Sequence, residues 1–306
     1  MLQNYLHPKL DCWLTHRNRQ WTGNVLSRAA DVLTNIQNAP QTLSPAIGFS
    51  TFNLRPFQLP VATPAVSIGL IYLLIISFFA FTFYLPIHMQ FVMPGHRPLK
   101  FLQLCIWRWC ATVTAYFLLS LIYSFISLAF QIPFSARPAL DTSVANSANA
   151  YHYGSFVVYW MLNWMGMLAL GMASENVAMI VGIPWVAFWL IFWVITNVST
   201  SFYSLELAPA FYRWGYAWPL HNSKFSDLLF SSFIKCGFPG PKYLLTASVV
   251  NASRTILFDV HSRIGVNFGV LLAWVVVNTT LFPFCCWFMR WKMIRMKKKE
   301  AAMKKG

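Results

Sequence analysis

One acidic residue and several asparagines lie inside or close to the long apolar stretches of this chain. Glu175 and Asn176 lie in the tetrapeptide ASEN, and Asn163 lies in the apolar stretch before it. An ionisable residue at membrane depth is costly and often functional. We therefore expect Glu175 either to gate or couple a transport step or to be a turn residue that reaches water, with Asn176 supporting it by hydrogen bonding. For Asn163 an interhelical hydrogen bond is favoured over substrate contact.

Sequence patterns typical of enzymes are absent from the chain. It has no G-x-x-x-x-G-K-[ST] phosphate loop, no H-E-x-x-H and no G-x-S-x-G, so it carries no ATPase of its own. Its six cysteines do not have metal-ligand spacing. We expect no catalytic residue, no metal and no cofactor, and a protein that is not an enzyme.

The elements that hold these polar residues are long apolar segments. Hydrophobic residues make up 57% of the 306 and charged residues 10%, whereas soluble domains have roughly 25% charged residues. Five stretches of membrane-spanning length contain no charge: 61–87, 109–132, 154–173, 177–198 and 264–289. The sequence therefore predicts an all-α polytopic membrane protein with five visible transmembrane helices. Because only Ser174 to Asn176 separate the third and fourth stretches, we expect a helical hairpin with Glu175 at its turn.

The basic residues set the expected orientation. All 23 lysines and arginines lie outside the five stretches, and eight of them lie in or beside the tail 291–306. Basic residues in short loops remain cytoplasmic, so 97–108 and the tail should lie inside, while 133–153 and 199–263 lie outside. The bilayer is then the main partner, with anionic inner-leaflet lipid at the basic tail. This explains the net charge of +15 without nucleic acid.

Three further features of the sequence predict a packing face, an interfacial segment and a glycosylation site. Gly265, Gly269 and Ala273 recur every fourth residue, which predicts a helix-packing face that serves folding or the formation of a homo- or hetero-oligomer. The aromatic stretch 205–222, with charged Glu206 and Arg213, should lie in the outer interface or dip into it, or else form a plain amphipathic linker. Asn251 begins an N-A-S sequon on the expected outer side and is a predicted glycosylation site.

Several stretches resemble the fungal nitrosoguanidine-resistance family, whose core is similar to the membrane domains of ABC-type exporter permeases and phage-infection proteins. They are VSIGLIYLLIISFFAFTF, AYFLLSLIYSFISLAFQ, FVVYWMLNWMGMLALGMASENVAM, PWVAFWLIFWVITNVSTSFYSLELAPAFYRWGYAWPLHN and RIGVNFGVLLAWVVVN. The resemblance implies a multi-pass protein of the fungal plasma membrane, an additional N-terminal helix and an extracytosolic domain before the helix cluster. It places 205–222 where exporter permeases have a re-entrant segment.

The chain departs from that pattern in two places. Residues 1–60 would be the remnant of the extracytosolic domain, without the first helix, so we expect that Met1 is not the natural start. Residues 223–248 interrupt the family-like text between Asn222 and Val249, and we interpret them as translated intron. The alternative is a genuine outer loop or a short sixth apolar segment. The helical membrane domain would then be 61–290.

Two functions from different classes fit these expectations. The favoured function is export or sensing of toxic amphiphiles or lipids, with drug resistance as the phenotype implied by the resemblance. Uncharged aromatic helix faces suit apolar substrates, and few intramembrane ionisable residues argue against a proton-relay antiporter. The alternative is a non-transporting membrane scaffold or regulator of other transporters or of lipid asymmetry.

Overall fold

The protein is described by a computed structural model that covers residues 12–21, 24, 53–56, 60–90, 100–140, 142–182, 185–202, 211, 218–220, 249–260 and 264–303. The chain divides into two compact units, 1–53 and 54–306. In the first unit the described part is mainly a helix over residues 12–21. Glu206, Arg213 and the interrupting segment 223–248 lie outside the described residues.

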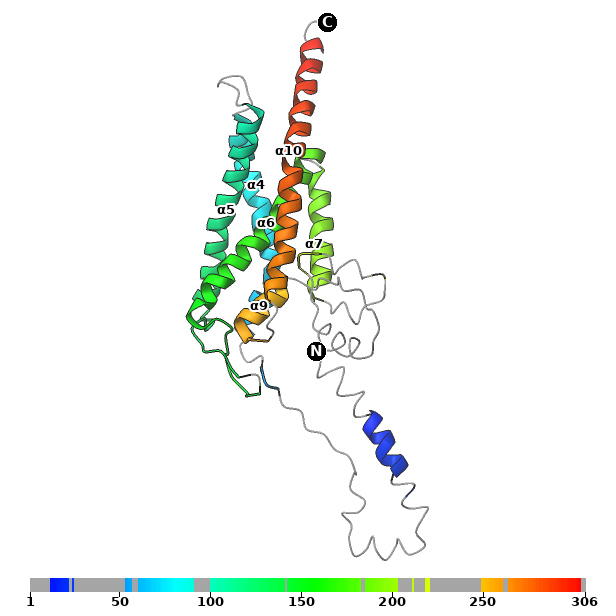
Figure 1. Ribbon diagram of the computed structural model, residues 1–306. Helices are drawn as coiled ribbons and strands as arrows, with labels where there is room; N and C mark the ends of the chain where they lie inside the picture. Colours follow the sequence, from blue (N-terminus) through cyan, green and yellow to red (C-terminus); the bar gives the residue numbers. More distant parts are fainter. Residues whose placement is uncertain are drawn as a thin grey trace, which may run out of the picture. The chain divides into compact units, whose positions relative to one another are not determined.

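The second unit is a helical bundle, drawn in Figure 1. No strand is found among the residues that the structure describes, so the predicted all-α membrane architecture is confirmed. Its longer helices are α4 (Ile71–Gln90), α5 (Phe101–Ala129), α6 (Ser155–Val181), α7 (Val186–Phe202), α9 (Val249–Phe258) and α10 (Ile264–Met303). Three short helical segments, η2 (Pro60–Ala62), α3 (Thr63–Val66) and η3 (Ile68–Leu70), come before α4, and Pro60–Val66 is bent by 51° from Ile71–Tyr84.

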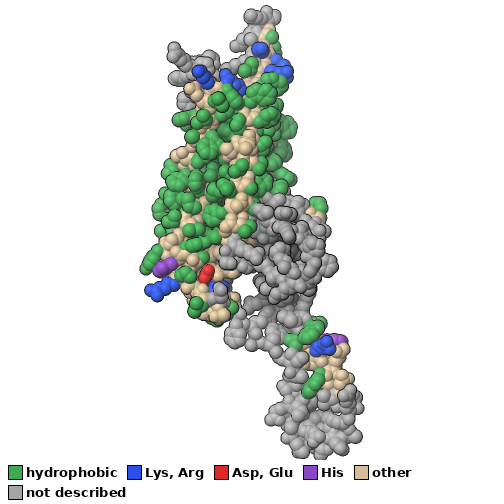
Figure 2. Space-filling model, viewed as in Figure 1, with side chains coloured by type: hydrophobic (Ala, Val, Ile, Leu, Met, Phe, Trp, Pro, Cys, Tyr) green, Lys and Arg blue, Asp and Glu red, His purple; other side chains and the backbone are tan. Residues whose placement is uncertain are grey.

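Successive long helices run in alternating directions (Figure 1). The start of α5, the end of α6, the start of α7 and the late part of α10 therefore share one end of the bundle. We call it the basic end, because Figure 2 shows lysine and arginine side chains gathered there beyond a belt of hydrophobic ones. The opposite end, with α9 and residues 130–140 and 142–151, is called the loop end.

Helix length and composition identify the membrane spans. Phe101–Ala129, His152–Val181 and Ile264–Met296 are long and apolar enough to cross a bilayer, and the bent pair before and within α4 raises the number to four. Apolar α7, with 17 residues, lies at the lower limit for a crossing. The five predicted stretches thus fall on apolar helical segments, although fewer than five helices reach full spanning length among the described residues.

The predicted hairpin turn at Ser174–Asn176 is wrong. Helix α6 continues through these residues to Val181 and ends at Gly182, whose φ is +91°. Glycine adopts positive φ without steric strain, so the chain turns there before α7. A polar triplet in an apolar run suggests a break in the helix. Here Ser174 donates to the backbone oxygen of Leu170 in the same helix, while Glu175 and Asn176 are bonded to neighbouring helices, so no turn is needed.

Two helix ends also differ from the predicted stretches. Helix α5 begins at Phe101 rather than at residue 109, so Arg108 lies inside a helix instead of in a cytoplasmic loop. Helix α10 runs past residue 289 to Met303 and includes most of the basic tail. In both places the helix extends beyond its apolar part, since lysine and arginine are good helix formers.

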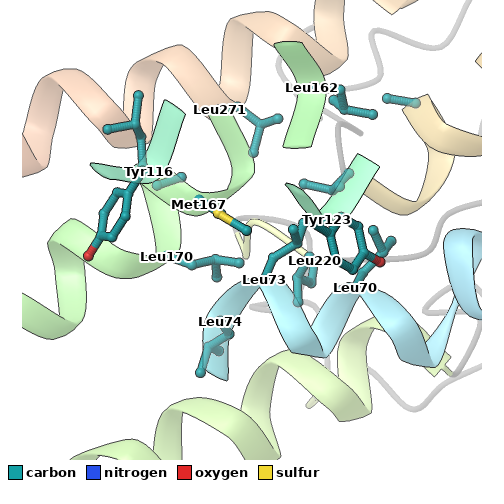
Figure 3. Packing of buried hydrophobic residues seen from close by; sticks show 14 of the residues in the cluster. Leu70, Leu73, Leu74, Tyr116, Tyr123, Leu162, Met167, Leu170, Leu220 and Leu271 are labelled. Carbon is teal, nitrogen blue, oxygen red and sulfur yellow. The ribbon is translucent and has the colours of Figure 1, made fainter. Parts of the chain in front are cut away.

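Helix α6 is the centre of the bundle and packs against α4, α5, α9 and α10. Figure 3 shows the core that surrounds it, with leucines of α4, Tyr116 and Tyr123 of α5, and Met167 of α6. A Cβ atom at Gly171 would lie 2.5 Å from the Tyr116 hydroxyl and 2.7 Å from Cβ of Ser77. The close approach of α4, α5 and α6 therefore depends on this glycine.

Candidate functional site: the ion pair and amide pair around helix α6

A buried ion pair joins α5 to α6 near the basic end. Arg108 Nη2 donates to Glu175 Oε1 over 2.8 Å, and both residues are completely buried. Arg108 is the eighth residue of α5 and Glu175 lies six residues before the end of α6. At 1.5 Å per residue, both lie about 10 Å inside their helices. The charges meet within the bundle, not at a water-filled turn.

Neighbouring side chains complete the surroundings of this pair. The Thr112 hydroxyl donates to Glu175 Oε2 over 3.0 Å, so both carboxylate oxygens are bonded. Arg108 also approaches the Met289 sulfur at 3.5 Å and lies over the Phe282 ring at 5.7 Å, both on α10. Its Nε has no hydrogen-bond partner among the described residues. The carboxylate is thus held from α5, and the guanidinium also contacts α10.

An amide pair joins α6 to α10 next to the ion pair. Asn176 Nδ2 donates to the backbone oxygen of Asn278 over 3.0 Å. Asn278 Nδ2 donates to the backbone oxygen of Trp274 over 2.9 Å and to that of Ala169 over 3.4 Å. Because Glu175 and Asn176 are consecutive and bond to different helices, one turn of α6 fixes the positions of both α5 and α10.

The burial of Arg108 and Glu175 requires that their charges be compensated inside the bundle. Burying two charges is costly, and the cost is offset only by close pairing and by hydrogen bonds to the remaining oxygens. Glu175 has both. Each carboxylate oxygen accepts one hydrogen bond, from Arg108 or from Thr112, so the structure holds a closed ion pair. This geometry suits a structural latch between α5 and α6.

Asn163 belongs to a second polar cluster, nearer the loop end. Its Nδ2 donates to the Ser124 hydroxyl of α5 over 3.0 Å. One turn away, the Ser127 hydroxyl and the Tyr159 hydroxyl lie 3.1 Å apart. All four residues are buried. Asn163 therefore makes a hydrogen bond between α5 and α6, the role that its position in an apolar stretch favours.

A third polar cluster holds the loop end together. Arg55 donates to the backbone oxygens of Leu140 over 2.9 Å, Ser143 over 2.7 Å and Asp259 over 3.3 Å. Asp259 Oδ2 accepts a hydrogen bond from the backbone N–H of Ala139 over 3.2 Å. Arg55 thus ties the segment before α4 to the α5–α6 connection and to the end of α9.

The other predicted site residues lie apart from the ion pair. A Cβ at Gly265 or Gly269 would meet nothing within 4 Å, and Ala273 is exposed. No described helix packs on this small-residue face, and the close helix approach occurs instead at Gly171. Asn251 lies half-buried on α9, with Ser253 of its sequon fully buried. Its glycosylation stays a prediction.

A shallow apolar groove opens between α6 and α7 at the basic end. Its volume is about 510 Å³, and it is lined by Val177, Val181, Trp185, Phe188, Trp189 and Phe192. Trp185 and Phe188 stack with their ring centroids 5.9 Å apart. A groove lined by aliphatic and aromatic side chains suits the apolar part of an amphiphile. We refer to it as the α6–α7 groove.

Comparison with known proteins gives the chain its family. Residues 1–225 match the family described as "Protein of unknown function (DUF3533)". The chain belongs to this family. It is also 30% identical over 240 residues to the "Uncharacterized endoplasmic reticulum membrane protein YJR015W" of Saccharomyces cerevisiae, a similarity that covers 77% of this chain and 39% of that relative. No solved structure matches it.

Membership in DUF3533 agrees with the fold. The relative is a membrane protein by its name, and helices of this chain are of spanning length, so the chain is a multi-pass membrane protein. The family match includes both Arg108 and Glu175. The chain spans 39% of the length of the relative. An activity that belongs to the whole length of such a protein is therefore only proposed for this chain.

The sequence of this DUF3533 chain contains a signal for the partner of Glu175 that hydropathy alone overlooks. Arg108 and Glu175 lie at the predicted cytoplasmic ends of neighbouring antiparallel segments. An acid and a base at the same depth on adjacent helices predict a pair. For Asn278 no comparable signal exists beyond general interhelical bonding, because periodicity does not show which helix faces which.

Proposed function

We propose that this chain is an exporter-permease-like membrane domain that binds and moves amphiphiles, including lipids and toxic compounds. Resistance would be the cellular consequence, as the resemblance to the nitrosoguanidine-resistance family implies. The observation that carries the proposal is the α6–α7 groove. Four of its six lining residues are aromatic, and Trp185 and Phe188 are exposed on the bundle surface. A lipid chain can reach such a groove sideways from the bilayer.

The packing of the bundle supports a fixed body of three helices and a separate helix, α7, that forms one side of the groove. The ion pair and the amide pair fasten α5, α6 and α10 into one body. Helix α7 packs on α6 and α4, and four residues, 182–185, connect it to α6. Movement of α7 relative to α6 would widen or close the groove without breaking a buried ion pair. The proposed role is transport or sensing, not enzymatic catalysis.

Reconstitution tests the proposed function. The chain is placed in liposomes that contain a fluorescent phospholipid, and a membrane-impermeant reductant reports how fast the probe changes leaflet. We expect faster movement than in protein-free vesicles, and slower movement for the double variant Trp185→Ala/Phe188→Ala. Ile195→Ala, on an exposed position of α7 outside the groove, is the matched control. Movement that is no faster than in empty vesicles contradicts the proposal.

The second candidate is a non-transporting scaffold or regulator, and one observation favours it. The face of Gly265, Gly269 and Ala273 is exposed and has no described helix on it, as expected of a surface that meets another subunit. Inactive vesicles together with copurification of a pump or flippase, lost in Gly269→Leu, would support this function instead.

The membrane in which the chain resides is part of the same proposal. The resemblance favours the plasma membrane, while the relative is named as an endoplasmic reticulum protein. We propose that the chain acts on lipid or amphiphile at one of these two membranes. A fluorescent C-terminal fusion in yeast, compared with markers of both membranes, distinguishes them.

A further inference from the structure

One end of the α6–α7 groove has a cation beside it. The Lys292 ammonium of α10 donates to the backbone oxygen of Val181 over 3.4 Å. Val181 is also a lining residue of the groove. The chain turns here at Gly182, and a Cβ on that glycine would lie 3.5 Å from Lys292 Nζ. The ammonium thus lies next to the glycine turn at the mouth of the groove.

The position of Lys292 matches the boundary of the bilayer. It is the second charged residue of α10, after Arg290, and follows the long apolar part of that helix. Two exposed tryptophans, Trp185 and Trp291, lie at the same end of the bundle, and Arg295 lies over the Trp291 ring at 3.8 Å. Tryptophan rings concentrate where the hydrocarbon core meets the headgroups. The ammonium is therefore at headgroup level and the groove at acyl-chain level.

The mouth of the groove is positively charged. An ammonium has three N–H donors, and Val181 takes one of those of Lys292. Arg290 and Arg295 flank Lys292 on the same helix. Glu175, the acid closest to the groove in sequence, is already bonded to a guanidinium. Among the described residues, the mouth therefore offers an anion two donors and a positive potential.

We infer that the α6–α7 groove and Lys292 form a binding site for an anionic glycerophospholipid, with the start of an acyl chain against Trp185 and Phe188 and the phosphate on the Lys292 ammonium. This inference rests on the proposed function and names the ligand class of that same groove. A zwitterionic headgroup brings its own ammonium next to Lys292, and the repulsion disfavours it. From Trp185, just before α7, to Phe192 the lining covers about 10 Å, so the site holds part of a chain and the glycerol rather than enclosing a lipid.

Lipid retention tests the site. The chain is assembled in nanodiscs of phosphatidylcholine with a minor amount of phosphatidic acid or phosphatidylethanolamine carrying identical acyl chains. After transfer to mild detergent, native mass spectrometry counts the lipids that remain bound. We expect selective retention of phosphatidic acid, reduced about fivefold in Lys292→Gln and retained in Lys292→Arg. Lys298→Gln removes the same charge farther along α10 and should leave retention unchanged.

A second variant keeps the test informative if Lys292→Gln disturbs the turn at Gly182. Trp185→Ala/Phe188→Ala removes the wall of the groove and should lower retention of phosphatidic acid while Lys292 stays in place. Equal retention of both minor lipids, insensitive to Lys292→Gln but lost in the wall variant, would overturn the anionic site and leave the proposed function standing. Lipid retention that the wall variant does not change would overturn both.

Discussion

At the scale of single residues, several buried polar groups hold helices together. Glu175 is bonded to Arg108 and Thr112 of α5, and the next residue, Asn176, is bonded to α10. The turn role expected for Glu175 from the sequence requires access to water, which complete burial excludes, while the gating or coupling role stays a prediction. Complete burial and two hydrogen bonds favour the latch.

Neutralising one partner tests the latch. Glu175→Gln leaves the Arg108 guanidinium buried without a counter-charge, which costs about 3–5 kcal/mol of stability and lowers the apparent Tm in detergent by roughly 10 °C. Arg108→Met/Glu175→Leu removes both charges, and we expect it to recover most of the loss because apolar pairs often replace buried ion pairs at little cost. Thermal unfolding, monitored by fluorescence, gives the apparent Tm of both variants. A double variant as unstable as Glu175→Gln would contradict the latch.

Arg55 makes a second prediction at this scale. Its guanidinium bonds backbone oxygens from two other parts of the chain, so Arg55→Gln should loosen the connection between α5 and α6. Amide hydrogen exchange in peptides covering 139–148 should become several-fold faster, while Arg55→Lys, which retains the charge but not the planar fork, should be intermediate.

Hydrogen–deuterium exchange with mass spectrometry measures this effect. Arg137→Gln is the matched control, because it removes one exposed positive charge from the same connection and should leave the exchange rates unaltered. Equal exchange in Arg55→Gln and the unmodified chain would mean that Arg55 does not hold this connection.

At the scale of helices, hydropathy predicted which segments are helical but not where they end. The predicted apolar stretches fall on helical segments, because burial in lipid requires internally bonded backbone. The end of α10 differs because lysine and arginine continue the helix, and the other boundaries differ because Arg108, Glu175 and Asn176 have partners on other helices. Such partners depend on three-dimensional packing, and a single sequence does not contain that information directly.

The glycines also show that a single sequence does not contain the contacts between helices, and two of them provide a matched pair of variants. Gly171 faces Tyr116 and Ser77 at less than van der Waals distance for an added Cβ, whereas Gly269 has open space. We expect Gly171→Ala to cost about 1–3 kcal/mol through overpacking. Gly269→Ala should be neutral or stabilising by up to about 1 kcal/mol, since alanine is the better helix former. The apparent Tm of each variant measures these effects. Equal changes in Tm for the two variants would contradict the assigned packing.

At the scale of the whole bundle, two chemically different ends are present. The basic end has Lys100, Arg290, Lys292 and the later cations of α10, while Arg55 and Asp259 meet at the loop end. The basic residues that flank the apolar stretches indicate this division from the sequence alone. The α6–α7 groove could not be predicted in the same way, because its lining comes from two helices whose mutual rotation is set by packing against the rest of the bundle.

The division into two ends predicts one orientation in the membrane. Basic residues next to a span stay on the cytoplasmic side, so the part of α10 after Arg290 should face the cytosol and residues 142–150 the other side. In sealed microsomes bearing a C-terminal epitope, added protease should remove the epitope without detergent, whereas an epitope inserted after Ser147 should be cut only after the membrane is opened. The opposite pattern would place Lys292 and the groove mouth in the other leaflet. The anionic lipid would then have to come from the lumenal or external side, where the attraction that we infer for Lys292 would act on a different lipid population.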